Sequence, residues 1–148
     1  MQKFGVDVSK WQSGFDFNKA LQEGVEFVIL RGAYAMGKDK CFEDFYKQCK
    51  SLNIPVGVYH YTMAETVDEA RAEANFMLNI LKGKQFEYPI WLDVEDKVQK
   101  TLGKDLLTQI ITTYLDILEG AGYYVGIYST YLYLRDYAHI DMLDKYDK

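Results

Sequence analysis

Two acidic residues stand two positions apart at the end of an apolar run, in the segment Trp91-Leu92-Asp93-Val94-Glu95-Asp96. Side chains alternate across a β-strand, so Asp93 and Glu95 should point to the same side. Two carboxylates in a partly buried site cannot both ionise freely, and one pKa should rise. A carboxyl group that keeps its proton near neutral pH can protonate a glycosidic oxygen, while its neighbour stabilises positive charge on the sugar. The spacing predicts glycoside hydrolysis, and a structural ion pair with Arg31 or a lysine is the alternative.

The segments around this pair alternate between predicted strands and predicted helices. Strands are expected at residues 3–8, 26–33, 55–61, 89–94 and 124–129, and helices at 15–23, 42–52, 66–83, about 106–120 and 130–138. Such apolar strands are typical of a parallel sheet that is buried on both faces. About five βα units in a row predict an α/β fold. We expect a TIM-like βα-barrel that these residues leave incomplete, because no glycine-rich phosphate loop favours a doubly wound nucleotide-binding sheet.

Polar residues cluster where the predicted strands end. They are Asp7 and Ser9, then Arg31, then Tyr59, His60 and Tyr61, then Asp93, Glu95 and Asp96, then Tyr128 and Ser129. The carboxyl ends of barrel strands converge on one face, and active sites occupy that face. We therefore expect one polar mouth, with Asp7 as a candidate third acid beside Asp93 and Glu95.

Composition restricts the function further. The chain has 148 residues, which suits one domain, and a net charge of −5, which argues against a nucleic-acid partner. No apolar run is long enough for a membrane span, and no cofactor motif is present. The N-terminus carries no apolar signal region, so we expect a protein of the cell wall or extracellular space whose signal was removed or that is released at phage lysis. Cys41 and Cys49 fall too far apart on one predicted helix for a disulfide, so we expect free thiols.

Several motifs together resemble glycoside hydrolase family 25, the Chalaropsis-type lysozymes of bacteria and phage. The opening Gly5-Val6-Asp7-Val8-Ser9-Lys10-Trp11-Gln12 looks like the first motif of that family, and Asp93-Val94-Glu95 matches the Asp-x-Glu of its fourth strand. Gly57-Val58-Tyr59-His60-Tyr61, Phe27 to Arg31 and Gly126-Ile127-Tyr128-Ser129 also match. The matches follow in order over essentially the whole chain. We interpret residues 1–148 as the catalytic domain of this family without its last strands.

The resemblance implies a function and roles for particular residues. It implies hydrolysis of the β-1,4 bond between N-acetylmuramic acid and N-acetylglucosamine in peptidoglycan glycan strands, with Glu95 as the general acid. Asp93 would stabilise the intermediate or position the N-acetyl group of the substrate, and Asp7 would orient the sugar. The remaining candidate substrate-binding residues are Tyr59, Tyr61, Arg31, Tyr128 and Trp11.

Three other functions are weighed against this one. A chitinase-like Asp-x-x-Asp-x-Asp-x-Glu pattern fails, because Trp91 and Tyr88 occupy two of its Asp positions. A metal-dependent hydrolase using Asp7, His60, Asp93 and Glu95 lacks the usual histidine spacing, so no metal is expected. A catalytically weak or dead barrel that only binds peptidoglycan or amino sugars remains the alternative.

The end of the sequence generates a separate expectation. The family continues with further strands and a late Asp that belongs to its active site, whereas this sequence stops at Lys148. The fifth strand would then present an unpaired edge, which favours pairing with another chain. We expect weak lysis, and we expect the chain to be either a trimmed piece of a longer protein or an assembly that covers the fifth strand with another chain. In the second case the homodimer interface should include residues 124 to 140.

Overall fold

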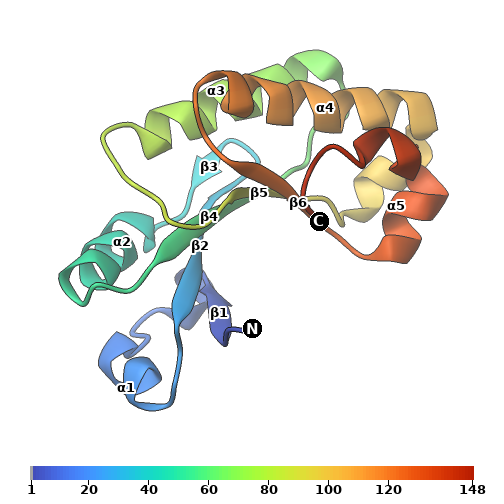
Figure 1. Cartoon of the computed structure of the whole chain (residues 1–148). Helices are drawn as coiled ribbons and strands as arrows, with labels where there is room; N and C mark the ends of the chain where they lie inside the picture. The colour runs from blue at the N-terminus through green and yellow to red at the C-terminus, as the bar shows by residue number, and fades with distance from the viewer. Residues whose placement is uncertain (1) are drawn as a thin grey trace.

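Helices alternate with the strands of a mostly parallel sheet in the computed structural model of the chain, which describes residues 2–148 (Figure 1). The strands are β1 (Gly5–Val8), β2 (Phe27–Tyr34), β3 (Gly37–Lys38), β4 (Val56–Tyr61), β5 (Ile90–Asp93) and β6 (Val125–Tyr128). The α-helices are α1 (Phe17–Gln22), α2 (Phe42–Ser51), α3 (Val67–Leu81), α4 (Lys104–Gly120) and α5 (Tyr131–Tyr137). Short 3-10 helices are η1 (Lys10–Gln12), η2 (Lys97–Thr101) and η3 (Ile140–Leu143). The predicted α/β fold is confirmed, while Met1 of the predicted domain lies outside the described residues.

The sheet runs in the order β1-β2-β4-β5-β6, and these five strands pair in parallel. In the described chain β1 and β6 are its two edges, so the sheet is curved but open (Figure 1). Beyond β6, Asp147 forms a single parallel bridge with Gly126, and its carbonyl accepts the Ile127 N–H at 2.7 Å. That bridge lies where the sequence predicts the next strand to begin.

The short strand β3 departs from the expectation of βα units alone. It pairs antiparallel with the end of β2, and Ala35 in the connecting turn has φ of 50°. That conformation is unusual for alanine. Both backbone polar groups of Ala35 are satisfied by β4, because its N–H donates to Tyr61 and its carbonyl contacts His60 Nε2 at 2.7 Å. Contacts between distant segments hold this hairpin, so local turn chemistry could not predict it.

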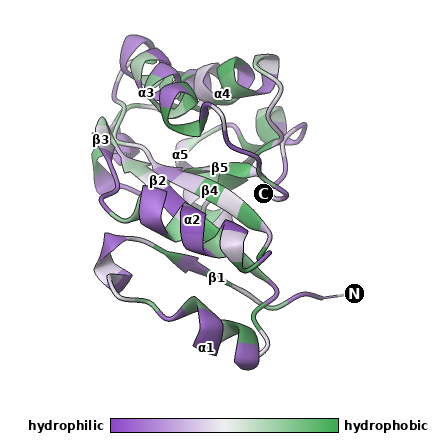
Figure 2. Cartoon of the chain, turned by 90° about the vertical axis from the view of Figure 1, so that its left-hand side faces the viewer, coloured by the Kyte–Doolittle hydropathy of each residue, from purple (hydrophilic) through white to green (hydrophobic). Residues whose placement is uncertain are grey.

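One face of the sheet is covered by helices and forms the core. Residues that point to this face are almost fully buried: Val28, Leu30, Val56, Val58, Ile90, Leu92, Val125 and Ile127. The amphipathic helices α3 and α4 pack against each other and on this face, and hydrophilic residues cover the viewer-facing side of α2 (Figure 2). Thr66 begins α3 as predicted, since its hydroxyl accepts the Glu69 N–H at 3.0 Å. Within residues 2–148 no helix combines the length and apolarity that crossing a membrane requires.

The opposite face of the sheet pairs large side chains with glycines on the neighbouring strand. Phe27 is in register with Gly5, Ile29 with Gly57, and Trp91 with Gly126. A Cβ atom on Gly126 would lie 2.5 Å from the Trp91 ring, and one on Gly5 would lie 2.3 Å from the Phe27 ring. The glycines therefore let the bulky side chains lie flat over the adjacent strand and form the floor of a hollow.

This packing predicts opposite effects for two glycine-to-alanine variants. Gly126→Ala should destabilise the fold by ~1–3 kcal/mol, because the new methyl group must displace the Trp91 ring. Gly120→Ala, at the end of α4 with nothing within 4 Å of the added methyl, should stabilise it by up to ~1 kcal/mol. Thermal denaturation of both variants tests this, and equal melting temperatures for the two would contradict it.

Candidate active site

A cavity of about 550 Å³ opens on the glycine-containing face of the sheet. It is lined by Gly5, Val6, Asp7, Phe27, Ile29, Arg31, Tyr59, Tyr61, Tyr88, Trp91, Asp93, Glu95 and Tyr128. These residues come from all five parallel strands and the segments next to β5. The floor is apolar and aromatic, and the acidic and phenolic groups gather toward the ends of the strands.

The cavity brings together every predicted site residue except Trp11. Asp7, Asp93, Glu95, Arg31, Tyr59, Tyr61 and Tyr128 all line it. Trp11 lies in η1, is 75% exposed and is not among the lining residues. The alternation of side chains along β5 is as predicted, because Asp93 and Glu95 open to the same side. A contribution of Trp11 to binding stays a prediction.

Asp93 is the buried member of the carboxyl pair. It is 5% exposed, and its Oδ1 atom has no hydrogen-bond partner among the described residues. Burial, then the hydrogen bond and negative charge of Glu95, and then the charge of Asp7 raise the pKa of Asp93 to about 8. A hydrogen bond between two carboxyl groups requires a proton on one of them, so Asp93 and Glu95 hold one proton between them near neutral pH.

Glu95 is the accessible member of the pair. It follows β5 directly and is exposed, while it still lines the cavity. Asp7, on the edge strand β1, is also exposed and lines the same cavity. A sugar in the cavity could therefore contact Glu95 and Asp7 directly. Asp93 would act from beneath Glu95.

Three tyrosine hydroxyls surround the acids and stay protonated. Burial raises the pKa of Tyr59 to about 12, and burial with the nearby charges of Asp7 and Asp93 raises the pKa of Tyr128. Tyr61 donates its hydroxyl to Asp96 Oδ2 at 2.7 Å, and its ring stacks on Tyr34 with centroids 4.8 Å apart. The rings offer flat surfaces to a sugar, and the hydroxyls of Tyr59 and Tyr128 can donate hydrogen bonds to it, whereas the Tyr61 hydroxyl already donates to Asp96.

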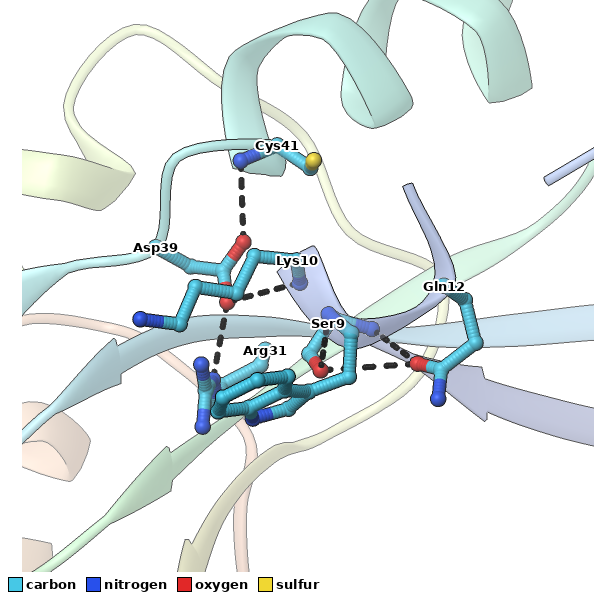
Figure 3. A network of polar contacts seen from close by, with 7 residues as sticks. Ser9, Lys10, Gln12, Arg31, Asp39 and Cys41 are labelled. Atoms are coloured by element: carbon cyan, nitrogen blue, oxygen red, sulfur yellow. Dashed lines mark hydrogen bonds and ion pairs between the residues drawn. The ribbon is translucent and has the colours of Figure 1, made fainter. Parts of the chain in front are cut away.

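Asp39 fixes the position of Arg31 at the rim of the cavity (Figure 3). The two form a buried ion pair with 2.8 Å between Arg31 Nε and Asp39 Oδ2. The carboxylate also accepts the backbone N–H groups of Lys10 at 3.1 Å and Cys41 at 2.9 Å. Asp39 therefore joins the loop after β1, strand β2 and the start of α2. This is an ion pair of the kind that the sequence left open for Arg31, but with Asp39 rather than Asp93 or Glu95.

His60 lies on the opposite side of the sheet from the acids. It is fully buried, with Nδ1 2.8 Å from the Tyr114 hydroxyl and Nε2 2.7 Å from the Ala35 carbonyl. Burial lowers the pKa of His60 to about 4, so it is neutral. The alternative of a metal site that combines His60 with Asp7, Asp93 and Glu95 is therefore wrong. No group of three or more His, Cys, Asp or Glu residues within 2–148 is arranged to hold a metal ion.

Several residues that line or support the cavity were not among the predicted site residues. Phe27, Ile29 and Trp91 share the strand parity of Arg31 and Asp93, so the period-two pattern already held the signal for the floor. Asp39 and the contacts of Asp96 gave no such signal, because they depend on loop positions. Cys41 and Cys49 are free thiols, as predicted.

Comparison with known proteins finds related chains over most of the sequence. The sequence model of glycosyl hydrolases family 25 matches residues 6–147. An autolytic lysozyme of Clostridium acetobutylicum is 26% identical over 133 residues, which are 89% of this chain and 40% of that protein. The chain thus spans less than half the length of this curated relative.

Two solved structures are similar as well. The modular autolysin LytC of Streptococcus pneumoniae, solved in complex with a synthetic peptidoglycan ligand, has a TM-score of 0.80 and 31% identity, covering 88% of this chain and 33% of that one. The catalytic domain of an endolysin from a Listeria monocytogenes bacteriophage has a TM-score of 0.80 and 26% identity, covering 99% and 70%.

The burial of Asp93 predicts a pH-dependent cost in stability. Its pKa is about 8 in the folded protein and about 4 in an unfolded chain, so stability should fall as pH rises between these values. Asp93→Asn should leave the melting temperature nearly unchanged at pH 4 and raise it at pH 8, by a few degrees for on the order of 1 kcal/mol. Asp141→Asn, at an exposed position of η3 that does not line the cavity, is the control and should show no such gain. A lower melting temperature of Asp93→Asn at pH 8 would contradict the prediction.

Proposed function

The chain belongs to glycosyl hydrolases family 25, and from that premise we propose that it is a lysozyme. Its substrate would be bacterial peptidoglycan, cleaved at the β-1,4 bond between N-acetylmuramic acid and N-acetylglucosamine. The observation that carries the proposal is the proton-sharing pair of Asp93 and Glu95 at one end of a cavity wide enough for sugar rings.

The proton shared by the pair would reach the substrate through Glu95. Glu95 is exposed to the cavity whereas Asp93 is buried beneath it. As the glycosidic C–O bond breaks, the leaving oxygen takes the proton and positive charge develops on the sugar. Asp93 would stabilise that charge or position the N-acetyl group. Water then adds to the sugar and returns a proton to the pair, which regenerates the enzyme.

The aromatic and charged groups around the pair would bind the glycan strand. Tyr59 and Tyr128 flank the acids on both neighbouring strands, and Asp7 faces them from β1. Arg31 would contact the substrate with guanidinium nitrogens other than Nε, which Asp39 occupies. Trp11 lies outside this group, and we propose that it contacts a glycan strand long enough to extend beyond the cavity.

The same cavity could bind peptidoglycan without cleaving it. The chain covers 40% of its autolytic relative, so the activity, substrate and wall location of a complete protein are proposals. The raised pKa of Asp93 distinguishes an enzyme from a binding module, because binding alone does not require it. A buried carboxyl group with an unpartnered oxygen reduces stability, and such a group is typical of a catalytic site.

The proposal includes assembly of two copies through the open edge at β6. Exposed large side chains gather on this strand and in the residues before and after it: Tyr124, Tyr128, Tyr131, Leu132 and Met142. Apart from the single bridge to Asp147, this edge has no partner strand among the described residues, and such an edge next to exposed apolar groups favours association. Sedimentation equilibrium of the 148-residue chain should give a dimer with residues 124–140 protected from hydrogen exchange. A monomer at all concentrations would contradict this assembly and leave the enzymatic proposal untouched.

The role of Glu95 predicts the effect of one isosteric change. Glu95→Gln should retain the fold and lower the rate of peptidoglycan hydrolysis by ~10²–10⁴, because an amide cannot supply the proton. Mass spectrometry of the digest measures the outcome: the parent should release fragments with reducing-end muramic acid. Reducing-end glucosamine would point to a glucosaminidase, and binding without new reducing ends would support the binding module. A Gln variant as active as the parent would show that Glu95 is not the acid.

A further inference from the structure

The peptide segment that carries Glu95 is fixed on both sides by hydrogen bonds, although Glu95 itself is exposed. On the preceding side, Val94 donates its N–H to the Tyr128 carbonyl at 2.9 Å, and its carbonyl accepts the Ser129 hydroxyl at 2.5 Å. These contacts join the end of β5 to the end of β6. Asp96, the residue on the other side of Glu95, is held by different groups.

Asp96 receives hydrogen bonds from three separate parts of the chain. Its Oδ2 atom accepts the Tyr61 hydroxyl from the end of β4 at 2.7 Å, and its backbone carbonyl accepts the Tyr133 hydroxyl from α5 at 2.7 Å. Its Oδ1 atom accepts the Val98 N–H at 2.8 Å and so begins η2. Asp96 is thus bound to the strand before β5, to the helix after β6 and to its own loop.

The side chains that hold Asp96 are themselves packed against other aromatic rings. Tyr133 is only 7% exposed and packs against Tyr137 with ring centroids 5.1 Å apart. The Tyr61 ring is stacked on Tyr34 at an angle of 6° between the planes. Because both hydroxyls are carried on packed rings, they can hold the Asp96 backbone in one place rather than follow its motion.

From this geometry we propose that Asp96, held by the hydroxyls of Tyr61 and Tyr133, is the positioning residue for Glu95. The proposal rests on the assignment of Glu95 as the acid. Apart from its hydrogen bond to Asp93, the exposed Glu95 carboxyl group has no packing to fix it, so the backbone held on either side determines how well it can reach that partner. Misplacement of a reacting group by about 1 Å can cost ~10²-fold in rate. Tyr61 therefore serves the acid through Asp96, in addition to lining the cavity.

A role in positioning and a role in substrate binding predict different kinetics. If the Tyr61 hydroxyl only contacted the sugar, Tyr61→Phe would raise KM and leave kcat unchanged. If it positions Glu95, Tyr61→Phe should lower kcat by ~10-fold with KM within about twofold, because the ring and its stacking on Tyr34 are kept. Asp96→Ala should lower kcat at least as much. The double variant should be no slower than Asp96→Ala alone, because both changes break one connection.

Three further variants separate positioning from general damage to the fold. Asp96→Asn keeps an oxygen for the Val98 N–H and a polar partner for Tyr61, so it should recover most of the rate that Asp96→Ala loses. Tyr133→Phe should lower kcat, whereas Tyr137→Phe, which removes a hydroxyl from the adjoining ring in the same aromatic pair, should not.

The deciding experiment combines these kinetics with a titration that needs no activity. Carboxyl carbon NMR of the 148-residue chain follows Asp93, whose pKa Glu95 raises. If Tyr61→Phe and Tyr133→Phe let Glu95 move away, the apparent pKa of Asp93 should fall by about half a unit or more, and Tyr137→Phe should not change it. An unchanged titration in both variants, additive losses in the double variant, or a KM effect alone would overturn the proposal. A chain that cleaves no peptidoglycan would refute the proposed function, and the titration would still decide whether Asp96 positions Glu95.

Discussion

A proton held between two carboxyl groups is the interaction on which the proposed chemistry depends. Asp93 is buried at the end of β5 with an unpartnered oxygen, and Glu95 follows it at the surface of the same cavity. Burial sets the pKa of Asp93 to about 8, so the pair keeps a proton that neither isolated carboxylate would keep at neutral pH. The sheet must bury one acid and expose the other: Asp93 is the last residue of β5, and Glu95 lies just beyond the end of the strand.

The rest of the fold holds that strand end in place. Helices cover one face of the sheet, and glycines on the other face let Phe27 and Trp91 form a floor below the acids. Asp39 ties the loop after β1 to Arg31 at the rim. Asp96 ties the loop after β5 to the tyrosines on each side. Each of these connections joins the carboxyl ends of neighbouring strands, which is where a βα fold places its site.

The sequence predicts the order of the elements and the set of acids, because both follow from local periodicity. The apolar strands, the Thr66 cap and the same-side placement of Asp93 and Glu95 need only neighbouring residues. The β3 hairpin could not be predicted, since Ala35 is held by His60 and Tyr61. Neither could the partners of Asp39 and Asp96, which lie in loops where no periodicity applies. Which of the two acids is buried could be learned only from the fold. The alternation pattern places both side chains on one side of the strand but does not show how deeply each is buried.

The pH dependence of hydrolysis tests the shared proton most directly. The rate of the parent should fall as pH rises through about 8, where the pair loses its proton. In Asp93→Asn the buried carboxyl group with the pKa of about 8 is gone. The alkaline limb of the profile should therefore move to lower pH, alongside a reduced rate. An alkaline limb at the same pH in parent and variant would contradict a proton shared between Asp93 and Glu95.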